Sequence, residues 1–135
     1  MSITEQGRKG EMLARKFLWR QKIDNLFQPD WMVVKEGRYY VIEVKCKEIF
    51  TAPPFDGQGL DIRQVHARMK LYKDTGIRCL FLVFCLNDAT IRWAWLDELE
   101  QTQYHDTRNG IRIYNINNFH EGGVFGPSPI KDVAS

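Results

Sequence analysis

The sequence predicts an α/β fold built around a mixed β-sheet, and three of its features lead to that prediction. Helix-like and strand-like segments occur in the order helix, strand, strand, helix, strand, strand. Residues 77–86 are almost continuously apolar, which is typical of a central strand. The chain has 135 residues, 44% of them hydrophobic, which is enough for one domain with a core of its own.

The N-terminal half should contain one helix and a β-hairpin. Ser2 and Glu5 fit a capping box, and the helix should run to about Gln21. Two strands, at residues 31–34 and 39–47, should then form a hairpin around a short turn. The apolar stripe of the helix consists of Leu13, Ala14, Phe17 and Leu18.

The second strand of this hairpin has an unusual distribution of charge. Side chains alternate between the two faces of a strand. The apolar face, which we expect to contact the core, carries Tyr40, Ile42, Val44 and Cys46. The other face carries Tyr39, Val41, Glu43, Lys45 and Lys47. Because charges are costly to bury unless they are paired or bind a ligand, the end of this strand is a candidate site.

The second half should hold a second helix and the rest of the sheet. Residues 51–59 are rich in proline and glycine and should form an irregular loop. Asp61 should cap a helix that ends at Gly76. The remaining elements should be a central strand at 77–86 covered on both faces, a strand at 91–96, a short helix or turn at 96–100 and a half-exposed edge strand at 111–116.

A single domain should span residues 1–126. Glycine, proline and serine become frequent past Phe119, so residues 127–135 should form a flexible C-terminal tail. The net charge of +2 is too small to indicate a polyanionic partner by itself. The three cysteines lie in apolar runs without metal-ligand spacing, which is typical of buried, reduced thiols in an intracellular protein. Neither a signal sequence nor a membrane-spanning run is expected.

One constellation resembles a known enzyme superfamily. Twelve residues separate Pro29-Asp30 from Glu43-Val44-Lys45, with a helix carrying Glu11 before this pattern and a helix containing Gln64 after it. This pattern is similar to the PD-(D/E)xK nucleases, and within them to RecU-type Holliday junction resolvases and VRR-NUC nucleases, over roughly residues 7–100. The resemblance implies a restriction-endonuclease-like sandwich, in which helices flank a central mixed β-sheet.

The resemblance also implies a metal site. Asp30 and Glu43 would be direct ligands of Mg²⁺, for which Mn²⁺ should substitute, with the backbone carbonyl of Val44 as a further ligand. Glu11 would be an outer ligand through water, and Lys45 would orient the attacking water. By themselves, Asp30 could be a turn residue, Glu43 and Lys45 a structural ion pair, and Glu11 a surface acid paired with Arg8 or Arg15.

Three further residues are candidate DNA contacts: Lys47, Gln64 and Arg68. Gln64 fits a capping box with Asp61 equally well. Relatives with a glutamine at this place often carry an aromatic residue four positions later, where this chain has Arg68. The histidines lack ligand spacing, and Trp93 and Trp95 alternate in a strand as packing residues do.

These residues predict a Mg²⁺-dependent DNA endonuclease, structure-selective on branched DNA such as Holliday junctions. Symmetric cleavage of a four-way junction needs two sites related by a two-fold axis, so a homodimer is expected. The expected location is the cytoplasm, at the nucleoid, and the gene could be carried by a phage. Two alternatives stay open: a restriction- or repair-type nuclease without junction preference, and a non-catalytic DNA-binding module of the same fold.

Overall fold

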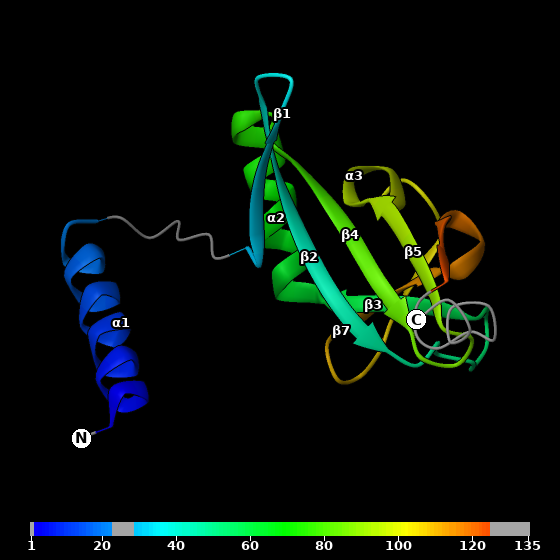
Figure 1. Cartoon of the computed structure of the whole chain (residues 1–135), viewed down its shortest axis with the longest axis horizontal. Helices are drawn as coiled ribbons and strands as arrows, with labels where there is room; N and C mark the ends of the chain where they lie inside the picture. The colour runs from blue at the N-terminus through cyan, green and yellow to red at the C-terminus, as the bar shows by residue number, and fades with distance from the viewer. Residues whose placement is uncertain (1, 23–28, 125–135) are drawn as a thin grey trace, which may run out of the picture.

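The computed structural model describes residues 2–22 and 29–124 and contains two β-sheets and three α-helices within those ranges (Figure 1). The N-terminal part and main sheet comprise α1 (Ile3–Arg20), β1 (Trp31–Lys35), β2 (Arg38–Lys47), β4 (Arg78–Cys85), β5 (Thr90–Trp95) and β8 (His120–Val124). The other elements are β3 (Gly57–Asp61), α2 (Ile62–Thr75), α3 (Leu96–Leu99), β6 (Tyr104–Asp106), β7 (Ile111–Asn115) and the 3₁₀ helix η1 (Ile116–Asn118).

The main sheet has the strand order β1-β2-β4-β5-β8 and is mixed. β2 pairs antiparallel with β1 and parallel with β4, and the chain crosses between β2 and β4 through β3 and α2. A parallel pair needs such a crossover, which a helix usually provides. The predicted α/β class and central mixed sheet are confirmed.

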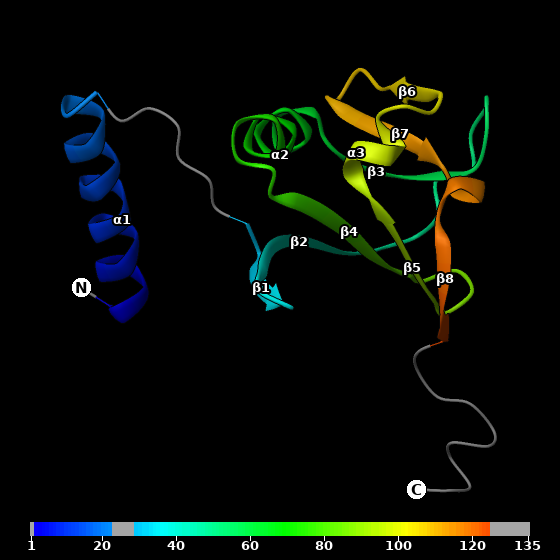
Figure 2. The same ribbon diagram turned by 90° about the horizontal axis from the view of Figure 1, so that it is seen from above.

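One face of the main sheet is covered and holds the core. In Figure 2, α2, α3 and the smaller sheet of β3, β7 and β6 lie on the same side of the main sheet. Val41 of β2 and Phe81 and Val83 of β4 are fully buried beneath these elements, against Val65 of α2. The apolar side chains of this layer exclude water from the strand face that also carries Glu43.

The predicted orientation of β2 and β4 is wrong. The buried side chains of β2 are Val41 and Glu43, whereas Tyr40, Ile42 and Val44 on the expected core face are half-buried and Cys46 is exposed. β4 likewise alternates buried and half-buried residues instead of being covered on both faces. Sequence patterning places charges outward by default, but here an arginine from α2 pairs with Glu43 and makes its burial tolerable.

Helix α1 forms as predicted but buries none of its side chains within the described part of the chain. The Ser2–Glu5 capping box is present. α1 has no buried residue, and Leu13 and Phe17 of its apolar stripe are 52% and 59% exposed. Both views show α1 standing apart from the sheets (Figures 1 and 2). The sheet is therefore flanked by α2 and α3 on one face only within the described residues.

The smaller sheet was not expected from the sequence. β3 lies in the segment predicted to be an irregular loop, and it pairs with β7, which is a central strand of this sheet instead of a half-exposed edge strand. A Cβ at Gly57 would lie 2.2 Å from the Tyr114 carbonyl oxygen, and one at Gly59 would lie 2.6 Å from that of Arg112. The glycines thus mark a strand in close contact with its neighbour and not a flexible loop.

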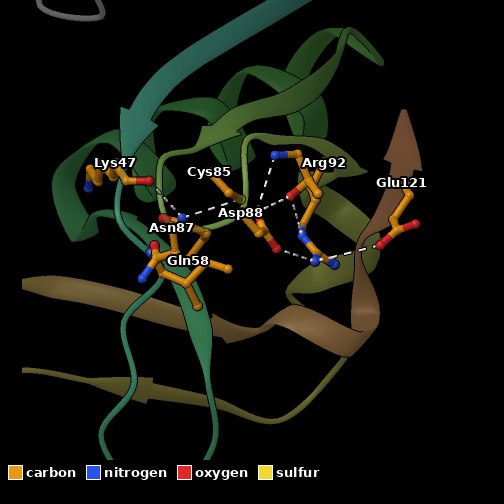
Figure 3. A network of polar contacts seen from close by, with 9 residues as sticks. Lys47, Gln58, Cys85, Asn87, Asp88, Arg92 and Glu121 are labelled. Carbon is orange, nitrogen blue, oxygen red and sulfur yellow. Dashed lines mark hydrogen bonds and ion pairs between the residues drawn. The ribbon is translucent and has the colours of Figure 1, made fainter. Parts of the chain in front are cut away.

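The end of the main sheet at β8 was also missed. β8 pairs with β5 through a register shift, and Arg92 of β5 links Asp88 at 3.2 Å with Glu121 of β8 at 3.6 Å (Figure 3).

The remaining predictions concern the cysteines, the tail and the membrane. Cys79 and Cys85 are buried free thiols, as predicted, whereas Cys46 is exposed. The predicted tail at 127–135 lies outside the described residues. Among the described helices, none has the length and apolarity needed to cross a membrane.

Candidate active site at the end of strand β2

Asp30 is anchored at the point where β1 stops pairing with β2. The register ends with Trp31 opposite Ile42, so the edge of β2 beyond Ile42 is open toward Asp30. The backbone N–H of Val44 donates a 2.8 Å hydrogen bond to Asp30 Oδ2. Since the N–H and C=O of one strand residue point to the same side, the Val44 carbonyl lies on the edge that faces Asp30.

Glu43 is the buried acid of the site. Its side chain is 1% exposed, and Oε1 accepts a 2.5 Å hydrogen bond from Nε of Arg68 on α2, whose side chain is 5% exposed. Neither Glu43 Oε2 nor Arg68 Nη1 has a hydrogen-bond partner among the described residues. Arg68 therefore holds Glu43 through Oε1, and Oε2 is left available to bind a ligand.

The electrostatics of Glu43 combine opposing influences. Burial raises its pKa most strongly, the hydrogen bond and positive charge of Arg68 lower it, and the neighbouring carboxyl of Asp30 raises it again. The net direction is upward. Asp30 and Glu43 lie within interaction range, and Glu43 Oε2 is buried without a partner from the described part of the chain. Their charged forms are therefore destabilised by each other and by loss of hydration. A cation bound between them would relieve both costs.

The available donors suit a hard divalent cation. Asp30, Glu43 and the Val44 carbonyl offer only oxygen atoms, which Mg²⁺ prefers. Within the described residues, no cluster of three or more His, Cys, Asp or Glu side chains is present. Two carboxylates and a carbonyl would leave several coordination positions to water, as Mg²⁺ commonly requires.

Lys45 and Gln64 come together beside this pair of acids. Lys45 follows Glu43 on the same face of β2, is half-buried, and lines a surface hollow with Asp61, Arg63, Gln64 and Ala67. Among the described residues Glu43 pairs with Arg68 and not with Lys45, so the structural ion pair considered above is not formed. Asp61 caps α2 by accepting from the Arg63 N–H at 2.8 Å, and Gln64 stays next to Lys45.

Two predicted DNA contacts occupy different environments. Lys47 is half-buried, and its Nζ donates to the Gly59 carbonyl at 3.1 Å; burial, and secondly the charge of Lys45, lower its pKa. Arg68 is 4% exposed and bound to Glu43, so its predicted role as a phosphate contact does not fit its position. In the sequence Arg68 looks like a surface residue of a helix. Its pairing with Glu43 spans 25 residues, so no local pattern indicates it.

The structure does not bring Glu11 to this site. Its side chain, 54% exposed on α1, forms an i,i+4 salt bridge of 3.4 Å with Arg15, which is the surface pairing that the sequence left open as an alternative.

The sequence interpretation missed Gln58 of β3, a 1% exposed amide near the C-terminal end of β2. Its only signal was a polar residue between two glycines in a segment that reads as a loop.

Comparisons with known proteins show little that is similar. No family model matches the chain, and no curated protein matches it significantly. Among solved structures, the chain is similar to Hjc, a Holliday junction resolvase from the archaeal hyperthermophile Archaeoglobus fulgidus. The two share 16% sequence identity, with 90% of this chain and 99% of that chain covered and a TM-score of 0.47. At that level the likeness carries no functional weight, and the function must be inferred from the side chains of the site.

Proposed function

We propose that this protein is a metal-dependent endonuclease that hydrolyses DNA phosphodiester bonds at the Asp30–Glu43 site. The observation that carries the proposal is the buried Glu43, which interacts with Asp30 at the open edge of β2 and whose Oε2 has no hydrogen-bond partner in residues 2–22 and 29–124. A purely structural acid in the core would have both oxygens satisfied. The same strand presents Lys45 two residues further on, in a surface hollow open to a substrate.

In this mechanism Asp30, Glu43 and the Val44 carbonyl would hold Mg²⁺, or Mn²⁺ in its place. When bound, the ion stabilises the negative charge that develops on the scissile phosphate. Arg68 fixes the carboxylate of Glu43 through Oε1, and Oε2 would be the oxygen that binds the ion. The hydrogen bond from Val44 to Asp30 performs the same task for the second acid.

Lys45 would act on the water that attacks the phosphorus. Its ammonium group lies in the hollow beside the acids, where it can hold a water molecule and a non-bridging phosphate oxygen together. The positive charge also opposes the charge that builds up on the phosphate. Gln64, in the same hollow, can donate to a phosphate oxygen and thereby set the position of the strand.

We further propose that the substrate is branched DNA, such as a four-way junction, and that the enzyme works as a homodimer inside the cell. The motif resemblance to junction resolvases favours this substrate. Symmetric cleavage requires two active sites related by a two-fold axis. The uncovered face of the main sheet, with half-buried Ile42, Leu80 and Trp93, offers apolar surface for a second copy.

The central test is the loss of cleavage in Asp30→Asn. We expect cleavage of a labelled DNA in Mg²⁺ to fall about a thousandfold, because a neutral amide oxygen binds the cation much more weakly than a carboxylate does. Asp74→Asn is the matched control, since that exposed acid pairs with Lys70 on the far part of α2. A chelator should stop the reaction and added Mg²⁺ or Mn²⁺ restore it. Normal cleavage by Asp30→Asn would exclude this site.

The substrate class is tested with linear duplex, single strand, flap and four-way junction of equal length in parallel. We expect faster cleavage of the branched DNAs, with symmetric cuts in the junction. Preference for linear duplex would favour the restriction- or repair-type alternative, and binding without cleavage would favour a DNA-binding module. The mass of the protein in solution, measured with and without junction DNA, tests the dimer.

A further inference from the structure

A second hollow lies beyond the active site along the same strand. It has a volume of about 790 Å³ and is bounded by the end of β2, the following loop, β3 and the turn between β6 and β7. This volume is within the range of small-molecule binding sites. Its lining includes Lys47, Phe50, Gln58, Arg108, Ile111 and Ile113.

The position of the hollow follows from the alternation of β2. Glu43, Lys45 and Lys47 share one face, and Lys45 lines the hollow beside the acids while Lys47 lines this second one. Neighbouring residues on one face of a strand are about 7 Å apart, so Lys47 lies roughly 13 Å along β2 from Glu43. A DNA strand held with its scissile phosphate at the acids would carry nearby nucleotides past this hollow.

The walls of the hollow suit a flat, weakly polar group. Phe50 offers a ring that is 36% exposed, and Ile111 and Ile113 of β7 supply aliphatic surface. Aromatic side chains bind bases of any sequence by stacking on their faces.

One buried amide is fixed in the wall of this hollow. Gln58 is 1% exposed, and its Nε2 donates to the Lys47 carbonyl at 3.4 Å and to Cys85 Sγ at 3.5 Å (Figure 3). An amide also carries a carbonyl oxygen, which can accept a hydrogen bond from the donor edge of a ligand.

The charges at the hollow suit a group attached to a phosphate backbone. Lys47 and the exposed Arg108 contribute two cations, with His105 beside them. Of the two acids in the lining, Asp106 is engaged by Arg112 at 2.9 Å, and Glu48 is exposed. An occupant with an apolar face, a hydrogen-bonding edge and neighbouring phosphates is a nucleotide.

We propose that this hollow binds a nucleobase turned out of the DNA a few nucleotides from the cleaved bond. The inference rests on the proposed nuclease function and gives it a source of selectivity. Extruding a base costs least where the base is mismatched or already unpaired. If binding requires a base in this hollow, DNA with unpaired or branched positions should therefore bind better than a regular duplex.

The test uses 2-aminopurine, whose fluorescence rises when it leaves the base stack. It is placed at successive positions on both sides of the cleavage point in a four-way junction, and the full-length Asp30→Asn protein is added so that the DNA stays intact. We expect one position to brighten about threefold or more. Phe50→Ala and Arg108→Ala, each in the same background, should remove most of this signal and weaken binding about fivefold or more.

Matched controls come from the other end of β2. Tyr39→Ala removes an aromatic ring that is 56% exposed, and Arg38→Ala removes an exposed guanidinium, both far from the hollow along the strand. These variants should keep the fluorescence signal. Wild-type protein is assayed for cleavage of the same DNA without the probe.

The outcomes separate the two proposals. Suppose that the wild type cleaves the DNA but no probe position brightens, or that the brightening persists in the Phe50→Ala and Arg108→Ala variants. Either result overturns the base pocket and leaves the nuclease proposal intact. A position-specific signal that both variants remove supports the pocket, even if the wild type fails to cut and the nuclease function is thereby rejected. Neither signal nor cleavage overturns both.

Discussion

The two faces of strand β2 are covered in the opposite way to the one that the sequence predicts. The face beneath α2 carries Glu43, Lys45 and Lys47 beside Val41, and Val41 and Glu43 are buried there. The other face carries Tyr40, Ile42 and Val44 and remains half-buried, with no described element covering it. Glu43 can be buried because Arg68 of α2 supplies the opposite charge. The half-buried apolar face is where we expect a second copy of the chain to bind.

The largest effect on stability should come from Arg68→Met. Without the guanidinium, Glu43 remains as a buried charge without compensation, which costs about 3–5 kcal/mol. The measurement is the free energy of unfolding from urea denaturation at neutral pH. The double variant Glu43→Leu/Arg68→Met should recover most of the loss, because a hydrophobic pair of similar volume is often as stable as an ion pair. A loss below about 1 kcal/mol in Arg68→Met would show that the pair is not formed in solution.

The second prediction compares the loss of stability caused by the same phenylalanine-to-alanine change on the two faces of β4. Phe81 is fully buried on the covered face and Phe84 is half-buried on the open face of β4. Phe81→Ala should cost about 3–5 kcal/mol and Phe84→Ala clearly less in dilute protein. If a second copy covers the open face, the cost of Phe84→Ala should instead grow with protein concentration. Equal costs at all concentrations would contradict the difference between the faces.

Thiol labelling should sort the cysteines by face. Cys46 is exposed on the open face, whereas Cys79 and Cys85 are buried on the covered face. Burial raises the pKa of Cys79 to about 12 from an ordinary value of 9.0. Because the thiolate is the reactive form, a thiol reagent at pH 8 should modify one cysteine in the native protein and all three in urea. Rapid modification of Cys79 in the native state would show that α2 does not cover β4.

The raised pKa of Cys79 should also affect the stability of the protein at alkaline pH. Above pH 9 the unfolded state loses the Cys79 proton while the folded state retains it up to about pH 12. The unfolded state then binds fewer protons, so the free energy of unfolding falls as the pH rises through this window. Cys79→Ala should show a shallower decline between pH 9 and 10 than the wild type, measured by urea denaturation.

The sequence predicted the elements better than their orientations. Capping residues at Ser2 and Asp61 and the glycine at 76 act locally, and both long helices begin and end close to the expected residues. The buried face of β2 depends on Arg68, 25 residues away, and no local pattern contains that contact. For the same reason Asp30, Glu43 and Lys45 could be proposed from their spacing, while the roles of Arg68 and Gln58 emerged only from packing. β3 escaped prediction because its glycines read as flexibility although they serve close strand contact.

The smallest effect should come from Glu11, and it decides whether α1 belongs to the site. Glu11 pairs with Arg15 on a helix that stands apart from the sheets, so Glu11→Gln should change cleavage less than about threefold. Glu5→Gln, at the helix start, is a matched control for any effect on α1 itself. A loss with Glu11→Gln comparable to that of Asp30→Asn would mean that α1 folds onto the open face when DNA binds. The open apolar face would then be the docking surface of the chain's own first helix, and the second copy would need another interface.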